Sequence, residues 1–111
     1  MGHESTVAIL SALAKELGIY IVGGSVPVSE DGKLYNTCFI FDRVGRQIAC
    51  HRKIHLFDCD ALNVHESHSF SPGNEITVFD TEFGTMGCAI CFDVRFPELF
   101  RAMAERGAKL I

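Results

Sequence analysis

Residues 87–100, GCAICFDVRFPELF, predict a strand that passes through a short turn into a helix. The strand is expected over residues 85–92, which are mostly apolar or small. Pro97 suits the first position of a helix, where its missing N–H is not needed, and Glu98 is favourable in the first turn. Gly107 is the expected end of this helix. A strand followed closely by a helix is typical of α/β layering, so an α/β fold is expected.

Hydrophobic spacing predicts few other elements. Ser5 is the expected N-cap of an amphipathic first helix, and Gly18 is its expected stop. Gly23 and Gly24 are expected to end the first strand. Two later strands should form a hairpin, and a long polar stretch is expected to be a functional loop. The predicted ranges are 6–17 for the helix, 19–22, 34–41, 47–56 and 76–81 for strands, and 57–74 for the loop.

Composition sets the class of protein. The chain has 111 residues, 48% of them hydrophobic and 22% charged, which fits one globular domain. A net charge of −4 argues against a nucleic-acid or anionic-membrane surface. Five cysteines, an odd number, suit a reducing compartment, and we expect the cytoplasm. Few elements are present for a sheet covered on both faces, and residues 108–111 look like half a strand. The sequence therefore predicts an internal part of a larger domain.

Cys88 and Cys91 are spaced Cys-x-x-Cys, a pattern found in redox pairs and zinc sites. On a strand over 85–92, however, side chains alternate, so these two thiols point to opposite faces. A redox pair needs sulfurs that meet, and a zinc site needs a second ligand pair. The other cysteines supply no such pair, so we expect no metal here.

Cys91 is left as a candidate nucleophile. It ends the predicted strand just before a turn into a helix, where α/β proteins place ligands. Gly87 and Ala89, on its own face, would leave room for a substrate. The alternative is that Cys91 is a packed core residue, which is how we interpret Cys88.

A nucleophilic thiol needs a base and a group that stabilises an oxyanion. The histidines at 51, 55, 65 and 68 are available as bases, and their spacing selects none of them. Lys53 lies in the predicted strand 47–56, on the face shared with His51 and His55. It points either to solvent or into a polar pocket.

Several stretches resemble the nitrilase superfamily of carbon–nitrogen hydrolases, and within it the omega-amidase branch. The resemblance covers essentially the whole chain. The stretches that carry it are GIYIVGGSVP, DGKLYNTCFIFDRVGR, HRKIHLFD, HES, SPGN, VFDTEFG and CAICFDVRFPEL.

The resemblance implies an incomplete portion of an α-β-β-α sandwich carrying part of a Glu-Lys-Glu-Cys set. Cys91 would attack the amide carbonyl and form a thioester. Lys53, with the backbone N–H of Phe92, would stabilise the oxyanion, and Glu66 would hold the lysine and the attacking water. Asp93 and Arg95 are interpreted as an ion pair that shapes the turn. The substrate would be a small amide of a dicarboxylic acid, and no cofactor is implied.

Two departures from the family pattern affect these expectations. The family's general-base glutamate lies upstream of the first helix, and Glu4 is not assigned that role. The stretch between Asp60 and Glu66 is a few residues shorter than in omega-amidases. We therefore expect the chain alone to be weak or inactive. The rival hypotheses are a non-catalytic subunit that pairs with a full-length homologue, and a thiol-redox or metal-binding domain; a homo-oligomer is also compatible with the family.

Overall fold

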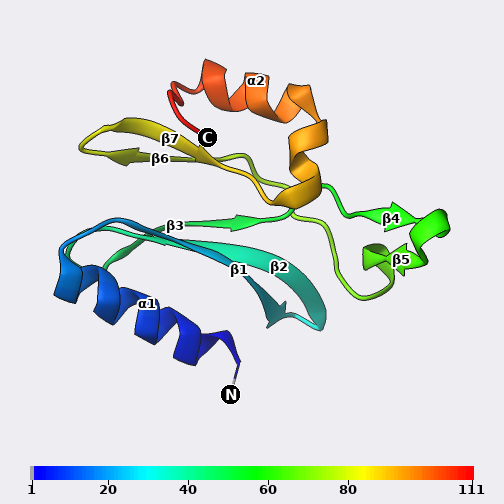
Figure 1. Ribbon diagram of the computed structural model, residues 1–111, viewed down its shortest axis with the longest axis horizontal. Helices are drawn as coiled ribbons and strands as arrows, with labels where there is room; N and C mark the ends of the chain where they lie inside the picture. Colours follow the sequence, from blue (N-terminus) through cyan, green and yellow to red (C-terminus); the bar gives the residue numbers. More distant parts are fainter. Residues whose placement is uncertain (1) are drawn as a thin grey trace.

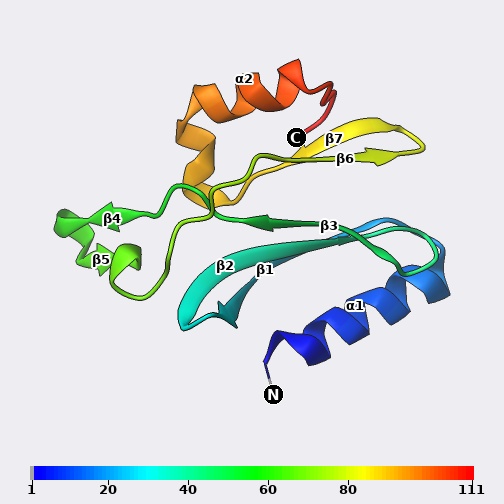
Figure 2. The ribbon, with the colours of Figure 1, turned by 180° about the vertical axis from the view of Figure 1, so that it is seen from behind.

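The computed structural model describes residues 2–111, and these form four layers. Helix α1 lies against one sheet, a second sheet lies on the other face of the first, and helix α2 covers the second sheet (Figure 1). The view from behind shows the same order (Figure 2). This arrangement confirms the predicted α-β-β-α layering. The principal elements are α1 (His3–Leu17), β1 (Ile21–Glu30), β2 (Lys33–Phe41), β3 (Gln47–Arg52), β6 (Thr77–Thr81), β7 (Gly84–Cys88) and α2 (Pro97–Glu105).

Both main sheets are antiparallel and are built from hairpins. The first has the order β1-β2-β3, and the second pairs β6 with β7. The predicted hairpin between β2 and β3 is confirmed, with Cys38 opposite His51. Leu110 adds a single parallel bridge to Met86, which is all that forms of the strand predicted at 108–111.

Both faces of strand β2 are buried, because the strand lies at the centre of the fold. Cys38 and Ile40 point into a cluster between the two sheets. Phe39 and Phe41 point into a second cluster beneath α1, which includes Ala14. The alternation of side chains along one strand thus divides the core into its two layers.

The first helix and first strand differ from their predicted bounds. Helix α1 begins after Gly2, so Ser5 lies within its first turn and is not its N-cap. Gly18 ends the helix in the left-handed conformation, as predicted. The predicted break at Gly23 and Gly24 is wrong. The strand continues past them because they form an irregularity in its pairing with β2, between Val22 and Ser25.

Gly87 makes room for helix α2 and not for a substrate. This corrects the expectation that Gly87 would leave space beside Cys91. It is buried, and a Cβ there would lie 2.5 Å from Sδ of Met103 on α2. Met103 is itself fully buried. The missing side chain therefore lets α2 approach β7, and a larger residue would push the two apart.

The segment predicted as an irregular loop is partly ordered. It contains β4 (Asp58–Cys59) paired with β5 (Val64–His65), with the short helices η1 (Asp60–Leu62) and η2 (Glu66–His68). Each element is only two or three residues long, too short to show a period in the sequence. The two-stranded unit projects from one end of the molecule (Figure 1).

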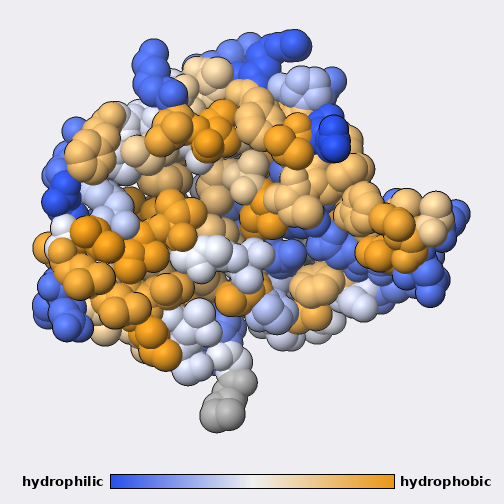
Figure 3. Space-filling model, viewed as in Figure 1, coloured by the Kyte–Doolittle hydropathy of each residue, from blue (hydrophilic) through white to orange (hydrophobic). Residues whose placement is uncertain are grey.

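The surface carries many exposed apolar side chains. They spread over the face seen in Figure 3, from α1 to α2. Val22, Leu110 and Ile111 line an open hollow with residues of β6 and β7. No helix within residues 2–111 combines the length and the apolar composition that crossing a bilayer requires.

Replacing Gly73 by alanine should destabilise the fold. Gly73 N donates to the carbonyl oxygen of Lys53 at 2.8 Å, and a Cβ at Gly73 would overlap the carbonyl oxygen of Arg52. Because a backbone oxygen cannot rotate away as a side chain can, the clash should shift the chain and lower the free energy of unfolding by about 1–3 kcal/mol. Urea unfolding followed by circular dichroism measures it. The exposed neighbour provides the control: Asn74→Ala should change the value by less than about 0.5 kcal/mol. Equal stability of Gly73→Ala and the unmodified chain would contradict this packing.

Candidate active site

Lys53 and Glu66 form a sheltered ion pair. Lys53 comes directly after β3, and only 3% of its side chain is exposed. Its Nζ lies 2.6 Å from Oε2 of Glu66, which begins η2. Of the two orientations that the sequence left open for Lys53, the structure shows the polar pocket. The shorter stretch before Glu66 has not moved its carboxylate away from the lysine.

The backbone of Lys53 is fixed on both sides. Its N–H donates to the carbonyl oxygen of Asn36 on β2 at 2.8 Å, and its own carbonyl oxygen accepts from Gly73 N. The hydrogen bond to Asn36 extends the pairing of the sheet by one residue, although the regular strand ends at Arg52. The lysine is thereby held at the end of the sheet with its side chain turned inward.

Glu66 accepts hydrogen bonds from three groups. Besides Lys53, Oε2 accepts from the backbone N–H of Phe57 at 2.8 Å, and Oε1 accepts from Nδ2 of Asn36 at 3.4 Å. Burial by itself raises the pKa of Glu66, but the hydrogen bonds outweigh it, and the pKa is held below its usual range. Glu66 is therefore an anion at neutral pH with both oxygens engaged.

Cys91 lies on a turn rather than on a strand. β7 ends at Cys88, and Cys91 is the first residue of the short helix η3 (Cys91–Arg95). Its φ is +50°, in the left-handed region that side chains with a Cβ rarely adopt. The residue is exposed, so the alternative of a packed core cysteine is wrong, whereas Cys88 is buried as expected. This geometry presents the Cys91 thiol at a sharp bend between strand and helix.

An open hollow of about 310 Å³ adjoins Cys91. Its wall is formed by Phe57, Phe92, Val94 and Arg95. The rings of Phe57 and Phe92 meet edge to face with centroids 5.1 Å apart. Since Phe57 also donates its N–H to Glu66, one residue joins the wall beside the thiol to the Lys53–Glu66 pair. The backbone N–H of Phe92 lies in the first turn of η3, where helical N–H groups have no partner inside the helix.

Asp93 organises this turn and is fully buried. Its Oδ2 accepts from the backbone N–H of Ile90 at 3.0 Å and lies 3.1 Å from Nε2 of His51. Its Oδ1 accepts from the backbone N–H of His55 at 2.9 Å and from its Nδ1 at 2.7 Å. The predicted ion pair with Arg95 is wrong, because both carboxylate oxygens are occupied by these groups. Arg95 instead lines the hollow.

The four hydrogen bonds keep Asp93 ionised despite its burial. Burial raises the pKa of the carboxyl group, but the hydrogen bonds from His51, Ile90 and His55 outweigh it, and the pKa falls well below its usual range. A carboxylate can only accept, so the facing ring nitrogen of each histidine carries a proton. On its other side, Nδ1 of His51 lies 2.9 Å from Oγ1 of Thr77 on β6.

This network bears on the histidines that the sequence offered as possible bases for Cys91. His51 is completely buried between Asp93 and Thr77, and His55 stacks on Phe96 with ring centroids 3.6 Å apart. Both are therefore engaged in shaping the turn. His65 stacks on His68 at 4.8 Å in the projecting unit. Sequence reasoning missed Asp93 as the centre of this network. The one available signal was the position of His51 and His55 on the face of Lys53.

Asp93→Asn should destabilise the fold most strongly near neutral pH. The charged acceptor is lost to both histidines, so the free energy of unfolding should fall by about 2–3 kcal/mol. The folded-state pKa is below the unfolded value near 4. Stabilisation by Asp93 is therefore fully present above about pH 4 and is lost as the pH falls toward the folded pKa. Urea titrations between pH 7 and pH 3 should show the two proteins converging in acid.

The control for this titration is Asp60→Asn, because 99% of the Asp60 side chain is exposed. It should change the free energy of unfolding by less than about 0.5 kcal/mol at each pH. A difference between the Asp93 variant and the unmodified chain that stays constant from pH 7 to pH 3 would contradict the ionised network.

Cys91→Gly should be more stable than Cys91→Ala. Glycine adopts a φ of +50° without the steric cost borne by alanine, which is about 1–2 kcal/mol in the left-handed region. Thermal unfolding of the two variants should give a higher Tm for glycine. At Ala89, where the backbone φ is not positive, the same change to glycine should lower the Tm. A lower Tm for Cys91→Gly would mean that the bend carries no strain.

Three comparisons relate this chain to known proteins. The profile of the carbon-nitrogen hydrolase family matches residues 2–111. Omega-amidase NIT2-A of Xenopus laevis is 48% identical over 111 residues, which is 97% of this chain and 40% of the relative. The crystal structure of Saccharomyces cerevisiae Nit3, a member of branch 10 of the nitrilase superfamily, superposes with a TM-score of 0.83 at 43% identity. That match covers 94% of this chain and 36% of Nit3.

A third relative has been captured with a bound reagent. In the amidase of Nesterenkonia sp. AN1, the acetamide moiety of fluoroacetamide is added covalently at the active-site cysteine of a mutant. It is 27% identical to this chain, with a TM-score of 0.81, and the match covers 96% of this chain and 40% of the amidase. The chain thus spans about two fifths of the length of the relatives it matches. It belongs to the carbon–nitrogen hydrolase family, within the nitrilase superfamily.

Proposed function

We propose that this chain carries part of the active site of an amidase that hydrolyses a small omega-amide of a dicarboxylic acid to the acid and ammonia. The observation that carries the proposal is the combination of an exposed cysteine on a strained bend with a sheltered Lys53–Glu66 pair joined to the same wall through Phe57. The names of the relatives, among them an omega-amidase, support the same reaction class.

The proposed first half-reaction makes a thioester. Sγ of Cys91 attacks the amide carbonyl carbon, and the carbonyl oxygen takes up the negative charge. Lys53 and the N–H of Phe92 stabilise that oxyanion, an effect worth about 10²–10³ in rate for each donor. The carbon–nitrogen bond then breaks. The leaving nitrogen takes the proton that the thiol has given up, and ammonia departs.

The second half-reaction consumes water. A water molecule attacks the thioester carbonyl, the carbon–sulfur bond breaks, and the proton from water restores the thiol. Glu66 holds Lys53 in position and, as an anion at neutral pH, can orient the water. The family's first glutamate, the general base, has no counterpart that we assign among residues 2–111. Loss of a general base costs about 10²–10⁴ in rate, so we expect weak turnover by the 111-residue chain.

Covalent labelling tests the proposed nucleophile without requiring turnover. Fluoroacetamide should alkylate Cys91 selectively, as read by mass spectrometry of the peptides. Displacement of fluoride at the methylene carbon creates no oxyanion, so Cys91 of the Lys53→Met variant should still be alkylated. Thioester formation from an amide should fall about 10²-fold in that variant, because the cation no longer stabilises the charge on the carbonyl oxygen. Cys50→Ser is the matched control because Cys50 is exposed but lies on β3, and it should leave the rate unchanged. Equal labelling of Cys50 and Cys91 would show ordinary thiol reactivity and sink the assignment.

Turnover is measured as ammonia release from a succinamate-type amide. Release by the chain that disappears in Cys91→Ala would show that a residue within it replaces the missing base. Selective labelling without release would show that the nucleophile is in place while the base is not. If the chain shows no labelling of Cys91 and no ammonia release, the proposal for this chain is overturned.

A further inference from the structure

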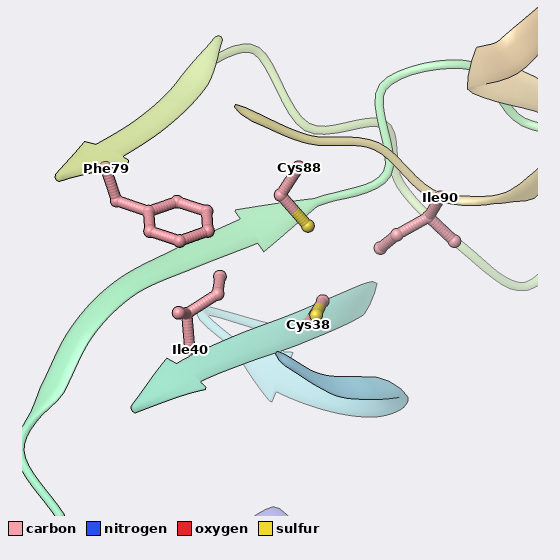
Figure 4. Packing of buried hydrophobic residues seen from close by; sticks show 5 residues of the cluster. All are labelled: Cys38, Ile40, Phe79, Cys88 and Ile90. Atoms are coloured by element: carbon pink, nitrogen blue, oxygen red, sulfur yellow. The ribbon is translucent and has the colours of Figure 1, made fainter. Parts of the chain in front are cut away.

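Two buried cysteines from different sheets lie in one cluster. Cys38 lies on the central strand β2 and is 2% exposed, and Cys88 is the last residue of β7 and is 6% exposed. Figure 4 shows the Cys88 side chain extending from β7 toward β2, where Cys38 lies, beside Ile40, Phe79 and Ile90. Both thiols are free. The nucleophile assigned above is neither of them.

We propose that Cys38 and Cys88 form a redox-active pair, which hydrogen peroxide converts into a disulfide between the two sheets. The proposal concerns a modification site distinct from the amide chemistry and does not depend on it. Its geometric basis is that both cysteines belong to one buried cluster and line the same hollow. A single cysteine packed in this core would have no partner to react with.

The pair is reachable by a small oxidant. Both cysteines line an open hollow of about 340 Å³, whose other lining residues include Gly24 and Ser25 of β1 and the exposed Cys91. Hydrogen peroxide is barely larger than water, and the hollow exceeds its volume many times. The small residues of β1 leave this route open beside the buried sulfurs.

The two thiols are not equivalent, which indicates the order of reaction. The neighbouring Cys88 thiol lowers the pKa of Cys38, and this outweighs the opposing effect of burial. The neighbouring Cys38 thiol, followed by burial, raises the pKa of Cys88. Because the thiolate is the nucleophile, Cys38 is the residue that peroxide oxidises first.

The chemistry balances without any further reagent. The Cys38 thiolate attacks one peroxide oxygen, the O–O bond breaks, and Cys38 becomes a sulfenic acid as one water leaves with the thiol proton. The Cys88 sulfur then attacks the sulfur of Cys38. The S–O bond breaks, a second water leaves with the Cys88 proton, and the disulfide forms. Two thiols are oxidised and one peroxide is reduced.

The other cysteines are poorly placed to compete. Cys50 is opposite Phe39 in the β2–β3 pairing, so it lies on the face of the sheet away from Cys38. Cys59 is in the projecting β4–β5 unit. Cys91 shares the hollow but lies on the bend beyond β7. A bridge between Cys38 and Cys88 would join the centre of the first sheet to the strand that leads into the bend.

Peptide mapping of Cys91→Ala after peroxide treatment tests the pair. Trypsin and a Glu-specific protease release residues 83–95, in which Cys88 is the only cysteine once Cys91 is replaced by alanine. Trypsin also releases residues 34–43, LYNTCFIFDR, which contain only Cys38. The expected product is these two peptides joined, with a mass about 2 Da below their sum, and lost on reduction with dithiothreitol.

Controls distinguish the proposed pairing from general thiol oxidation. Adding Cys50→Ser should leave the joined peptides in full yield, whereas adding Cys88→Ser should abolish them. In denaturing urea, the selectivity should disappear because the fold no longer brings the two thiols together. Oxidation should also raise the Tm of the folded chain by several degrees, reversibly, since the bridge closes a long loop of the unfolded chain.

Two results would overturn the proposal, and neither depends on whether the Cys88 variant folds. In the first, Cys38 and Cys88 both stay open to alkylation, or pass to sulfinic acids, while the Cys91→Ala chain is folded. In the second, the major cross-link joins Cys50 or Cys59 instead.

Discussion

The candidate site depends on one buried carboxylate. Asp93 accepts hydrogen bonds from the backbone N–H of Ile90, just before the bend, from His51 on β3, and from His55, which follows β3. The distances are 2.7–3.1 Å. An unpaired carboxylate at full burial would be far too costly to keep ionised. The four donors offset that cost only when they converge on Asp93, so the carboxylate specifies the relative position of three chain segments.

The bend at Cys91 follows from this constraint. A residue with a Cβ at φ +50° is held there only when its surroundings determine its conformation. Asp93 supplies that determination because it bonds to Ile90 on one side of Cys91 while lying two residues beyond it on the other. The same carboxylate fixes His55, two residues after Lys53. The thiol and the lysine are thus positioned from one buried group.

Much of the fold could be predicted from local sequence. Pro97 marked the start of α2 and Gly18 the end of α1 because both act through their own backbone conformation. The continuation of β1 through Gly23 could not be predicted. A Cβ at Gly23 would lie 2.6 Å from Leu10, and that contact arises only after α1 has packed on the sheet. The β4–β5 unit was missed because its strands are too short for any periodicity.

The site was only partly predictable for the same reason. Cys91 could be singled out by its place just before the turn into a helix. The roles of Lys53 and Glu66 came from the resemblance to a family, because spacing alone did not assign them. The Asp93–His51 contact joins residues 42 apart, and nothing local distinguishes it from an Asp93–Arg95 ion pair two residues apart. Burying Lys53 with Glu66 brings little net stability, since desolvation consumes most of the attraction. The pair is therefore better explained by the position it gives the lysine than by the stability it adds.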